Sequence, residues 1–270
     1  MSQSLSLSSP YPSAVTIGMQ KGGVGKSFLT VNTAIFLAQA GHKVLIIDLD
    51  PEACATNLLL AEDISYETLG TVLEVYNGDC VTFADVIVKT RYAGLDLVAC
   101  KAKARRVNKL VSGSNPKKLL TAKMAGLEHY DAIFFEIPPT FSDIISSAYL
   151  TSRLIIFPTF PDVWSLESIS LSMEDIQEEC QKFDVDVPEF KILLNKYLAK
   201  RSASKETLEV LKQDYNEYLL PFYVKDSADV QNSLNEGKSI FEGHYSAEVR
   251  DSIQQLATYI LPQKHQKERG

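Results

Sequence analysis

The sequence has no apolar stretch long enough to cross a membrane, and its cysteines form no metal-binding pair. No apolar run approaches the ~18 residues that a membrane-spanning helix needs. The four cysteines stand far apart in the chain, without a C-x-x-C pair: Cys54, Cys80, Cys100 and Cys180. This spacing argues against a zinc ribbon or a disulfide framework. We therefore expect a globular protein with reduced thiols, located in the cytoplasm and without a membrane partner.

Signal-peptide features are also missing from the start of the sequence. Residues 1–13 are rich in serine and contain two prolines, but they have neither a charged first segment nor an apolar core. We expect a disordered tail over residues 1–13, one domain over residues 14–262, and a charged, solvated tail over residues 263–270. The sequence shows no internal repeat.

Acidic residues are absent from one segment of an otherwise acidic chain. The formal net charge is −7, yet no Asp or Glu lies between Asp96 and Glu128. The eight cations of this basic segment, residues 101–123, are Lys101, Lys103, Arg105, Arg106, Lys109, Lys117, Lys118 and Lys123. The rest of the chain has 19 basic and 34 acidic residues. The basic segment is equally consistent with a surface for DNA or another polyanion and with a solvated helix face.

One stretch has the composition of a phosphate-binding loop. It is Gln20-Lys21-Gly22-Gly23-Val24-Gly25-Lys26-Ser27. The β-branched run 15–17 before it predicts a buried strand, and apolar residues at helical spacing predict a helix over residues 28–40. A strand, a glycine-rich turn and a helix start direct several backbone N–H groups and the positive end of a helix dipole at one point.

The side chains of this loop suit a polyphosphate with a metal ion. Its glycines leave no side chain between the backbone amides and a phosphate, Lys26 supplies a charge for the β- and γ-phosphates, and the Ser27 hydroxyl can bind Mg²⁺. We expect nucleotide contacts from Gly22, Gly23, Val24, Gly25, Lys26, Ser27 and Phe28. A turn that binds nothing would not explain two lysines at these positions.

Acidic residues end two further apolar runs. The run 43–51 predicts a buried strand that ends in Asp48 and Asp50, and the run 130–139 predicts another that ends at Glu136. In parallel sheets, ligands bind at the carboxyl ends of the strands. Aspartates at such positions can alternatively cap the next helix.

The remaining pattern alternates strands with helices. Further strands are expected over residues 94–99, 154–159, 191–195 and 219–224. Helices are expected within residues 65–79 and over residues 116–126, 164–176, 204–216, 229–234 and 247–261, with Pro262 ending the last. Continuous apolar strands separated by helices indicate an α/β fold: one doubly wound, mostly parallel sheet with helices on both faces, forming a single P-loop domain.

The early lysine of the loop, Lys21, resembles the deviant Walker A motif of the ParA/MinD family of P-loop ATPases. The D-x-D-P sequence after residue 47 and the strand ending in Glu136-Ile137-Pro138-Pro139 are similar to that family's other motifs. The resemblance implies ATP and Mg²⁺ as cofactors and an ATP-sandwich homodimer in which Lys21 reaches the partner's nucleotide. It also implies that Lys26 contacts the phosphates and that Asp50 orients the attacking water. Asn195 would contact the adenine.

Magnesium would be arranged by Ser27 with Asp48 or Glu136. The loop departs from the general Walker A pattern G-x-x-x-x-G-K-[ST], which has a glycine at the position of Gln20. The sequence departs from the ParA/MinD family itself at Glu136, where aspartate is usual. Residues 52–54 read Glu-Ala-Cys in place of the family's Gln-Gly-Asn. These changes put the rate of hydrolysis in question more than nucleotide binding.

What the sequence lacks narrows the choice within the family. Paired cysteines of a metal-carrier type are missing, and the last residues lack the apolar-faced basic helix of a MinD-like membrane ATPase. The chain is most similar to ParA-type partition or cargo-positioning ATPases, which implies non-specific DNA binding, a ParB-like or cargo adaptor partner, and a nucleoid location. The cations of residues 196–205 offer a second DNA surface. The alternative is an ATP-binding scaffold with negligible hydrolysis that acts through protein partners.

Overall fold

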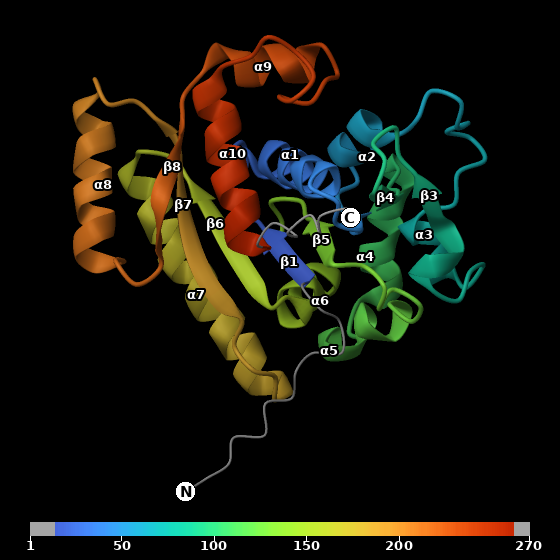
Figure 1. Cartoon of the computed structure of the whole chain (residues 1–270). Helices are drawn as coiled ribbons and strands as arrows, with labels where there is room; N and C mark the ends of the chain where they lie inside the picture. The colour runs from blue at the N-terminus through green and yellow to red at the C-terminus, as the bar shows by residue number, and fades with distance from the viewer. Residues whose placement is uncertain (1–13, 262–270) are drawn as a thin grey trace, which may run out of the picture.

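A single mixed sheet forms the centre of the protein. The computed structural model describes residues 14–261, with the side chains of residues 163–165 left out. Within these residues the sheet has eight strands in the order β3-β4-β2-β5-β1-β6-β7-β8 (Figure 1). The strands are β1 Ala14–Ile17, β2 Val44–Asp48, β3 Ile87–Lys89, β4 Leu95–Val98, β5 Ala132–Glu136, β6 Leu154–Thr159, β7 Glu189–Tyr197 and β8 Leu219–Lys225. Strand β3 runs antiparallel to β4, and every other pairing is parallel.

Helices cover both faces of this sheet. They are α1 Lys26–Gln39, α2 Cys54–Leu59, α3 Val72–Asn77, α4 Arg105–Val111, α5 Pro116–Leu119, α6 Asp143–Thr151, α7 Val163–Phe183, α8 Ser202–Asp214, α9 Ala228–Asn235 and α10 Ala247–Ile260. Helices α1, α2 and α10 bury their apolar residues in one core, and α3, α4, α6, α7 and α8 in the other. Figure 1 shows α1 and α10 on the near side of the sheet. The predicted doubly wound α/β class is confirmed.

The strand sequences explain why two cores form. In β5, Ile133 and Phe135 pack into the core beneath α6 and α7, whereas Phe134 packs into the core beneath α1 and α10. Successive strand side chains point to opposite faces, so a continuous apolar run needs cover on both sides. The apolar runs of the sequence therefore become central strands.

The topology brings the phosphate-binding loop and two acidic residues to one edge of the sheet. Strand β1 lies in the middle, between β5 and β6, and the chain passes from it toward β2 on one side and later toward β7 and β8 on the other. The pairing of β2 with β5 sets Asp48 opposite Glu136. Parallel strands end at the same edge, so the loop after β1 and the acids that end β2 and β5 meet there.

The helix predicted over residues 116–126 is wrong as a single element. Helix α5 ends at Leu119, and a separate 3-10 turn covers Thr121–Lys123. The backbone N–H of Leu120 donates to the Ser147 hydroxyl of α6 at 3.0 Å, a contact outside the helix. This contact with α6 thus accompanies a break in the helix that the spacing of apolar residues predicts. Helix α7 extends to Phe183, beyond its predicted end, and α6 and the short strand β3 were not predicted. The predicted tails and Pro262 lie outside the described residues.

Candidate functional site

The loop between β1 and α1 wraps around the start of the helix. Gly25 precedes Lys26, the first residue of α1, and has a left-handed backbone with φ 90°. A β-carbon added at Gly25 would lie 2.5 Å from the amide nitrogen of Asn195, so both the backbone and the close approach require glycine. Gly22 and Gly23 are exposed, and nothing lies within 4 Å of a β-carbon added at either. The loop is therefore open to solvent on one side and packed on the other.

Both lysines of the loop contact the protein itself. The Lys26 ammonium donates to the backbone carbonyl of Lys21 at 2.9 Å. The Lys21 ammonium donates to both carboxylate oxygens of Asp162, at 3.1 and 3.3 Å. Burial lowers the pKa of Lys26, while the nearby charges of Glu136, Asp50 and Glu52 raise it. Lys26 is buried between the loop and two strand ends. Its ammonium is therefore well placed to donate hydrogen bonds to phosphate oxygens.

Ser27 and Glu136 form the point at which the first turn of α1 meets the end of β5. The Ser27 hydroxyl donates to one carboxylate oxygen of Glu136 in a short hydrogen bond. The other oxygen, Oε2, is buried and has no hydrogen-bond partner within the described residues. Burial, with the nearby charges of Asp48 and Asp50, raises the pKa of Glu136 to about 8.

These groups fit a magnesium ion. An unsatisfied buried carboxylate oxygen beside a serine hydroxyl offers the hard oxygen ligands that Mg²⁺ prefers. Residues 14–261 hold no cluster of three acidic, histidine or cysteine side chains able to form a complete metal cage. Mg²⁺ usually takes only one or two protein ligands and fills its shell with water and substrate phosphates. Ser27 and Glu136 are therefore sufficient protein ligands for a nucleotide-bound ion.

The raised pKa of Glu136 predicts a pH-dependent penalty on folding in the absence of nucleotide. The group's folded pKa, about 8, lies above its ordinary value of 4.5, so its contribution to stability is complete below pH 4.5 and is lost as the pH rises through 8. Glu136→Gln removes this titration. As the pH rises from 6 to 8, we expect the free energy of unfolding of the wild type to fall by at least about 1 kcal/mol relative to that of Glu136→Gln. Urea unfolding at both pH values measures the difference, and parallel pH profiles for the two proteins would contradict the prediction.

Asp48 is held entirely by protein groups. Its Oδ1 accepts the backbone N–H of Asp50 at 3.0 Å, and its Oδ2 accepts both the N–H and the hydroxyl of Thr56, at 3.0 and 2.7 Å. Burial raises the pKa of Asp48 to about 7. Because both oxygens are occupied, Asp48 is suited to orient the site and to act on a metal through water, rather than to bind it directly.

Thr56 is a site residue that the sequence did not reveal. Besides its bond to Asp48, its hydroxyl oxygen accepts the backbone N–H of Cys100 at 2.9 Å. Thr56 therefore links the start of α2 to the ends of β2 and β4. Thr56 matches the last residue of the family's P-Q-G-N-A-T run, and that match was the signal that could have pointed to it. Only the folded chain shows its bonds to Asp48 and Cys100.

Asp50 feels the charges of Lys26 and Arg105, and its side chain is hydrogen-bonded within its own turn. One carboxylate oxygen accepts the N–H of Glu52 at 2.9 Å. Burial raises the pKa of Asp50, and the charges of Lys26 and Arg105 act in the opposite direction. Ala53, which ends this turn, has a left-handed backbone with φ 54°. The second oxygen of Asp50 is the group that could hold a water molecule.

Asn195 joins the end of β7 to the phosphate-binding loop. Its side-chain amide donates to the carbonyl of Val24 at 2.9 Å, and its side-chain oxygen accepts the N–H of Lys196 at 2.9 Å. Lys196 has a left-handed backbone with φ 54°, beside a register irregularity between β7 and β8. Such a bend re-aims side chains, and here it accompanies the contact of Asn195 with the loop. The structure thus brings the predicted adenine residue to the predicted phosphate residues.

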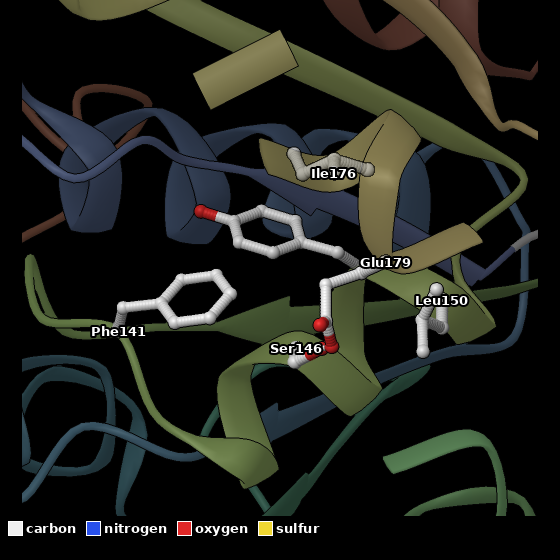
Figure 2. A pocket seen from close by; sticks show the side chains of 6 residues that line it. Phe141, Ser146, Leu150, Ile176 and Glu179 are labelled. Atoms are coloured by element: carbon white, nitrogen blue, oxygen red, sulfur yellow. Dashed lines mark hydrogen bonds between the residues drawn. The ribbon is translucent and has the colours of Figure 1, made fainter. Parts of the chain in front are cut away.

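A second concave region lies away from these groups. It is a shallow depression between α6 and α7, lined by Phe141, Ser146, Tyr149, Leu150, Ile176 and Glu179 (Figure 2). The Ser146 hydroxyl donates to Glu179 at 2.7 Å across it. The depression has no enclosed space for even a water molecule. It therefore does not compete with the loop as the nucleotide site.

Fold and site together define a P-loop nucleotide-binding protein, and comparison with known proteins narrows the class. A family model described as an AAA domain matches residues 13–192. The chain belongs to this family and, by its relatives, to the ParA/MinD family of P-loop ATPases. The resemblance inferred from Lys21 is confirmed.

Three similar proteins illustrate the relationship. The cell division protein PomZ of Myxococcus xanthus is 29% identical over 244 residues, which cover 90% of this chain and 76% of PomZ. The sporulation initiation inhibitor protein Soj of Bacillus subtilis is 24% identical over 228 residues, covering 84% of this chain and 89% of Soj. An ATP complex of a McdA variant from Cyanothece superposes with a TM-score of 0.82 at 17% identity, covering 94% of this chain and 98% of McdA. This last likeness shows the fold alone.

Proposed function

We propose that this protein is a weak, Mg²⁺-dependent switch ATPase that dimerises with ATP, binds DNA without sequence preference, and positions a plasmid, chromosome or protein complex through a ParB-like or cargo adaptor. The carrying observation is the second lysine, Lys21, at the start of a phosphate-binding loop whose neighbours are the acidic ends of β2 and β5. The relatives support the proposal, since PomZ is a cell division protein and Soj regulates sporulation initiation.

Nucleotide binding is assigned to the loop and its neighbours. The backbone N–H groups of residues 22–28 surround the phosphates, Lys26 turns from the Lys21 carbonyl to the β- and γ-phosphates, and Asn195 contacts the adenine. Ser27 and Glu136 would hold Mg²⁺, which would supply positive charge to the transferred phosphoryl group. Asp48, kept in place by its hydrogen bonds to Thr56, would act on the ion through water.

Hydrolysis is assigned to Asp50 and Lys21. Phosphoryl transfer depends on placing a water in line with the γ-phosphate and on stabilising charge. The oxygen of Asp50 that is not bound to Glu52 holds that water, and Lys21 of each protomer contacts the nucleotide of the other. We expect slow turnover because Glu136 is one methylene longer than aspartate and near-octahedral Mg²⁺ tolerates displacement poorly.

A nucleotide-dependent scaffold is the second candidate function. It is favoured by the bond from Glu52 N–H to Asp50, which occupies part of the proposed catalytic carboxylate, and by the exposed charge of Glu52 beside the phosphate site. In that case ATP drives dimerisation with a partner protein while hydrolysis is negligible. Single-turnover hydrolysis, with and without DNA, separates the two functions.

The ammonium contacts of the basic segment favour residues 196–205 as the DNA surface. In the basic segment, three ammonium groups are already bound to backbone carbonyls: Lys101 to Leu69, Lys117 to Phe183 and Asp184, and Lys123 to Val81. At the start of α8, Lys200, Arg201 and Lys205 are exposed and form no ion pair with any described residue. We assign DNA phosphates to residues 196–205. No described helix has the length and apolarity that a membrane span requires.

Neutralising the start of α8 tests both the DNA binding and its location. The triple variant Lys200→Ala, Arg201→Ala and Lys205→Ala should weaken ATP-dependent binding to a fluorescent duplex at least tenfold at low salt, because three phosphate contacts are lost. The slope of log affinity against log salt should fall by about 2 to 3. Fluorescence anisotropy at several KCl concentrations measures both.

A matched variant serves as the control. Lys103→Ala, Arg106→Ala and Lys109→Ala remove the same charge from exposed positions in and beside α4 and should change the slope by less than 1. If the α4 variant instead shows the larger loss, the DNA surface belongs to the basic segment. If the wild type binds no DNA with ATP at either salt, the DNA part of the proposal fails.

A further inference from the structure

Both the side chain and the backbone of Lys21 form hydrogen bonds within its own protomer. Its ammonium contacts both oxygens of Asp162, and its backbone carbonyl accepts the ammonium of Lys26. Asp162 lies in the short turn between the end of β6 and the start of α7. Strand β6 is the direct neighbour of β1, from which the loop emerges. The contact therefore joins the loop and the turn that follow two adjacent central strands.

This arrangement opposes the role proposed for Lys21. A lysine ammonium has three N–H donors, and two of those of Lys21 already point to the oxygens of Asp162. At most one donor is left for a partner's phosphate while this pair is intact, so Asp162 competes with the partner's nucleotide for Lys21. Phosphate oxygens also compete with the Lys21 carbonyl for the Lys26 ammonium. Binding of ATP to Lys26 thus weakens one of the contacts that hold the Lys21 residue.

We propose that Asp162 is a positioning residue that holds Lys21 on its own protomer and thereby sets the strength of ATP-dependent dimerisation. The inference rests on the proposed function, in which Lys21 acts across the dimer. It assigns Asp162 an inhibitory role in the monomer: the acid keeps the dimerisation lysine in place until ATP and a second protomer together compete for it.

The exposure of the pair sets the expected size of the effect. The Lys21 and Asp162 side chains are 28% and 37% exposed, so water and salt weaken their attraction. Ion pairs of this kind change an equilibrium by roughly 1.5- to 5-fold. A dimer breaks two of them, one in each protomer, so loss of the pair should tighten dimerisation by about 2- to 25-fold. The pair is therefore a modest bias on the equilibrium.

Asp175, on helix α7, provides a matched control. It accepts a hydrogen bond from the side-chain amide of Gln20, the residue before Lys21, at 3.1 Å. Asp175→Asn removes the same unit of charge as Asp162→Asn and also touches the loop, but it leaves the Lys21 contact intact. Asp162→Glu keeps the charge, and Asp162→Ser tests whether the amide of asparagine itself matters.

The test measures dimerisation with the non-hydrolysable analogue AMPPNP and Mg²⁺ by analytical ultracentrifugation at 50 and 500 mM KCl. We expect Asp162→Asn and Asp162→Ser to lower the dimer dissociation constant 2- to 25-fold at 50 mM KCl. The difference from the wild type should shrink below 2-fold at 500 mM, because salt already screens the pair. Asp175→Asn should stay within 2-fold of the wild type, and Asp162→Glu should remain nearer to it than Asp162→Asn.

The contrary outcomes separate this inference from the function on which it rests. A wild type that dimerises with AMPPNP, together with an Asp162→Asn variant of equal or weaker dimerisation, overturns the inference and leaves the proposed function standing. Equal tightening by Asp175→Asn also overturns it, since the effect would then be one of net charge. A wild type that stays monomeric with AMPPNP overturns both.

Discussion

Replacing Lys26 with alanine is expected to lower the affinity for ATP at least 100-fold. Lys26 begins α1 and is only 7% exposed, so its ammonium meets the phosphates in a region largely shielded from water. Hydrogen bonds to charged groups contribute roughly 1.5–3 kcal/mol, and Lys26 is placed for more than one. Isothermal titration calorimetry with ATP and Mg²⁺ measures the loss.

Lys43→Ala is the control for this experiment. Lys43 is exposed and precedes β2, at the end of the sheet opposite the phosphate-binding loop, so its removal subtracts the same charge without touching the site. Its affinity should match that of the wild type. Unaltered ATP affinity in Lys26→Ala would mean that the loop does not bind the nucleotide, and the proposed function would be abandoned.

Replacing Asp50 with alanine is expected to reduce ATP hydrolysis about 100-fold while ATP affinity changes by only a few fold. The side chain is proposed to hold the attacking water, an interaction that matters in the transition state more than in the bound ground state. Asp50→Asn should show the same loss, although asparagine can keep the turn bond to the N–H of Glu52. Quenched-flow or single-turnover phosphate release measures the rate.

The control is the neighbouring acid. Glu52 is exposed and adjacent to Asp50, and Glu52→Gln should leave the rate unchanged or raise it, since it removes negative charge near the phosphates. If phosphate release is no faster in the wild type than in Asp50→Ala, Asp50 takes no part in hydrolysis. The scaffold function would then be preferred.

The sequence could predict those parts of the site that lie at the ends of strands or at the start of a helix. Lys26 begins helix α1, and Asp48 and Glu136 end apolar strands. Parallel topology brings such positions to one edge of the sheet. The register of β2 with β5 then sets Asp48 opposite Glu136. The spacing of apolar residues and the order of the elements along the chain are enough to predict that these positions meet.

The parts that could not be predicted depend on distant contacts. Lys21 and Asp162 are separated by 141 positions, and Thr56 and Cys100 by 44, with no periodic signal to pair them. Strand β3 has three residues, and none of them is buried, so it lacks the apolar alternation by which strands are recognised. Both kinds of feature are set by tertiary packing.

The left-handed backbone of Ala53 has a consequence for how fast the site can change. The sequence places alanine where the ParA/MinD family usually has glycine, and the chain still adopts φ 54° there. A β-carbon in this region raises the energy by about 1 kcal/mol. Because the strain exists only in this conformation, it shortens the residence time of the turn that carries Asp50 by roughly fivefold if the strain is released at the barrier. The methyl group of Ala53 is therefore expected to favour departures from the turn that carries Asp50.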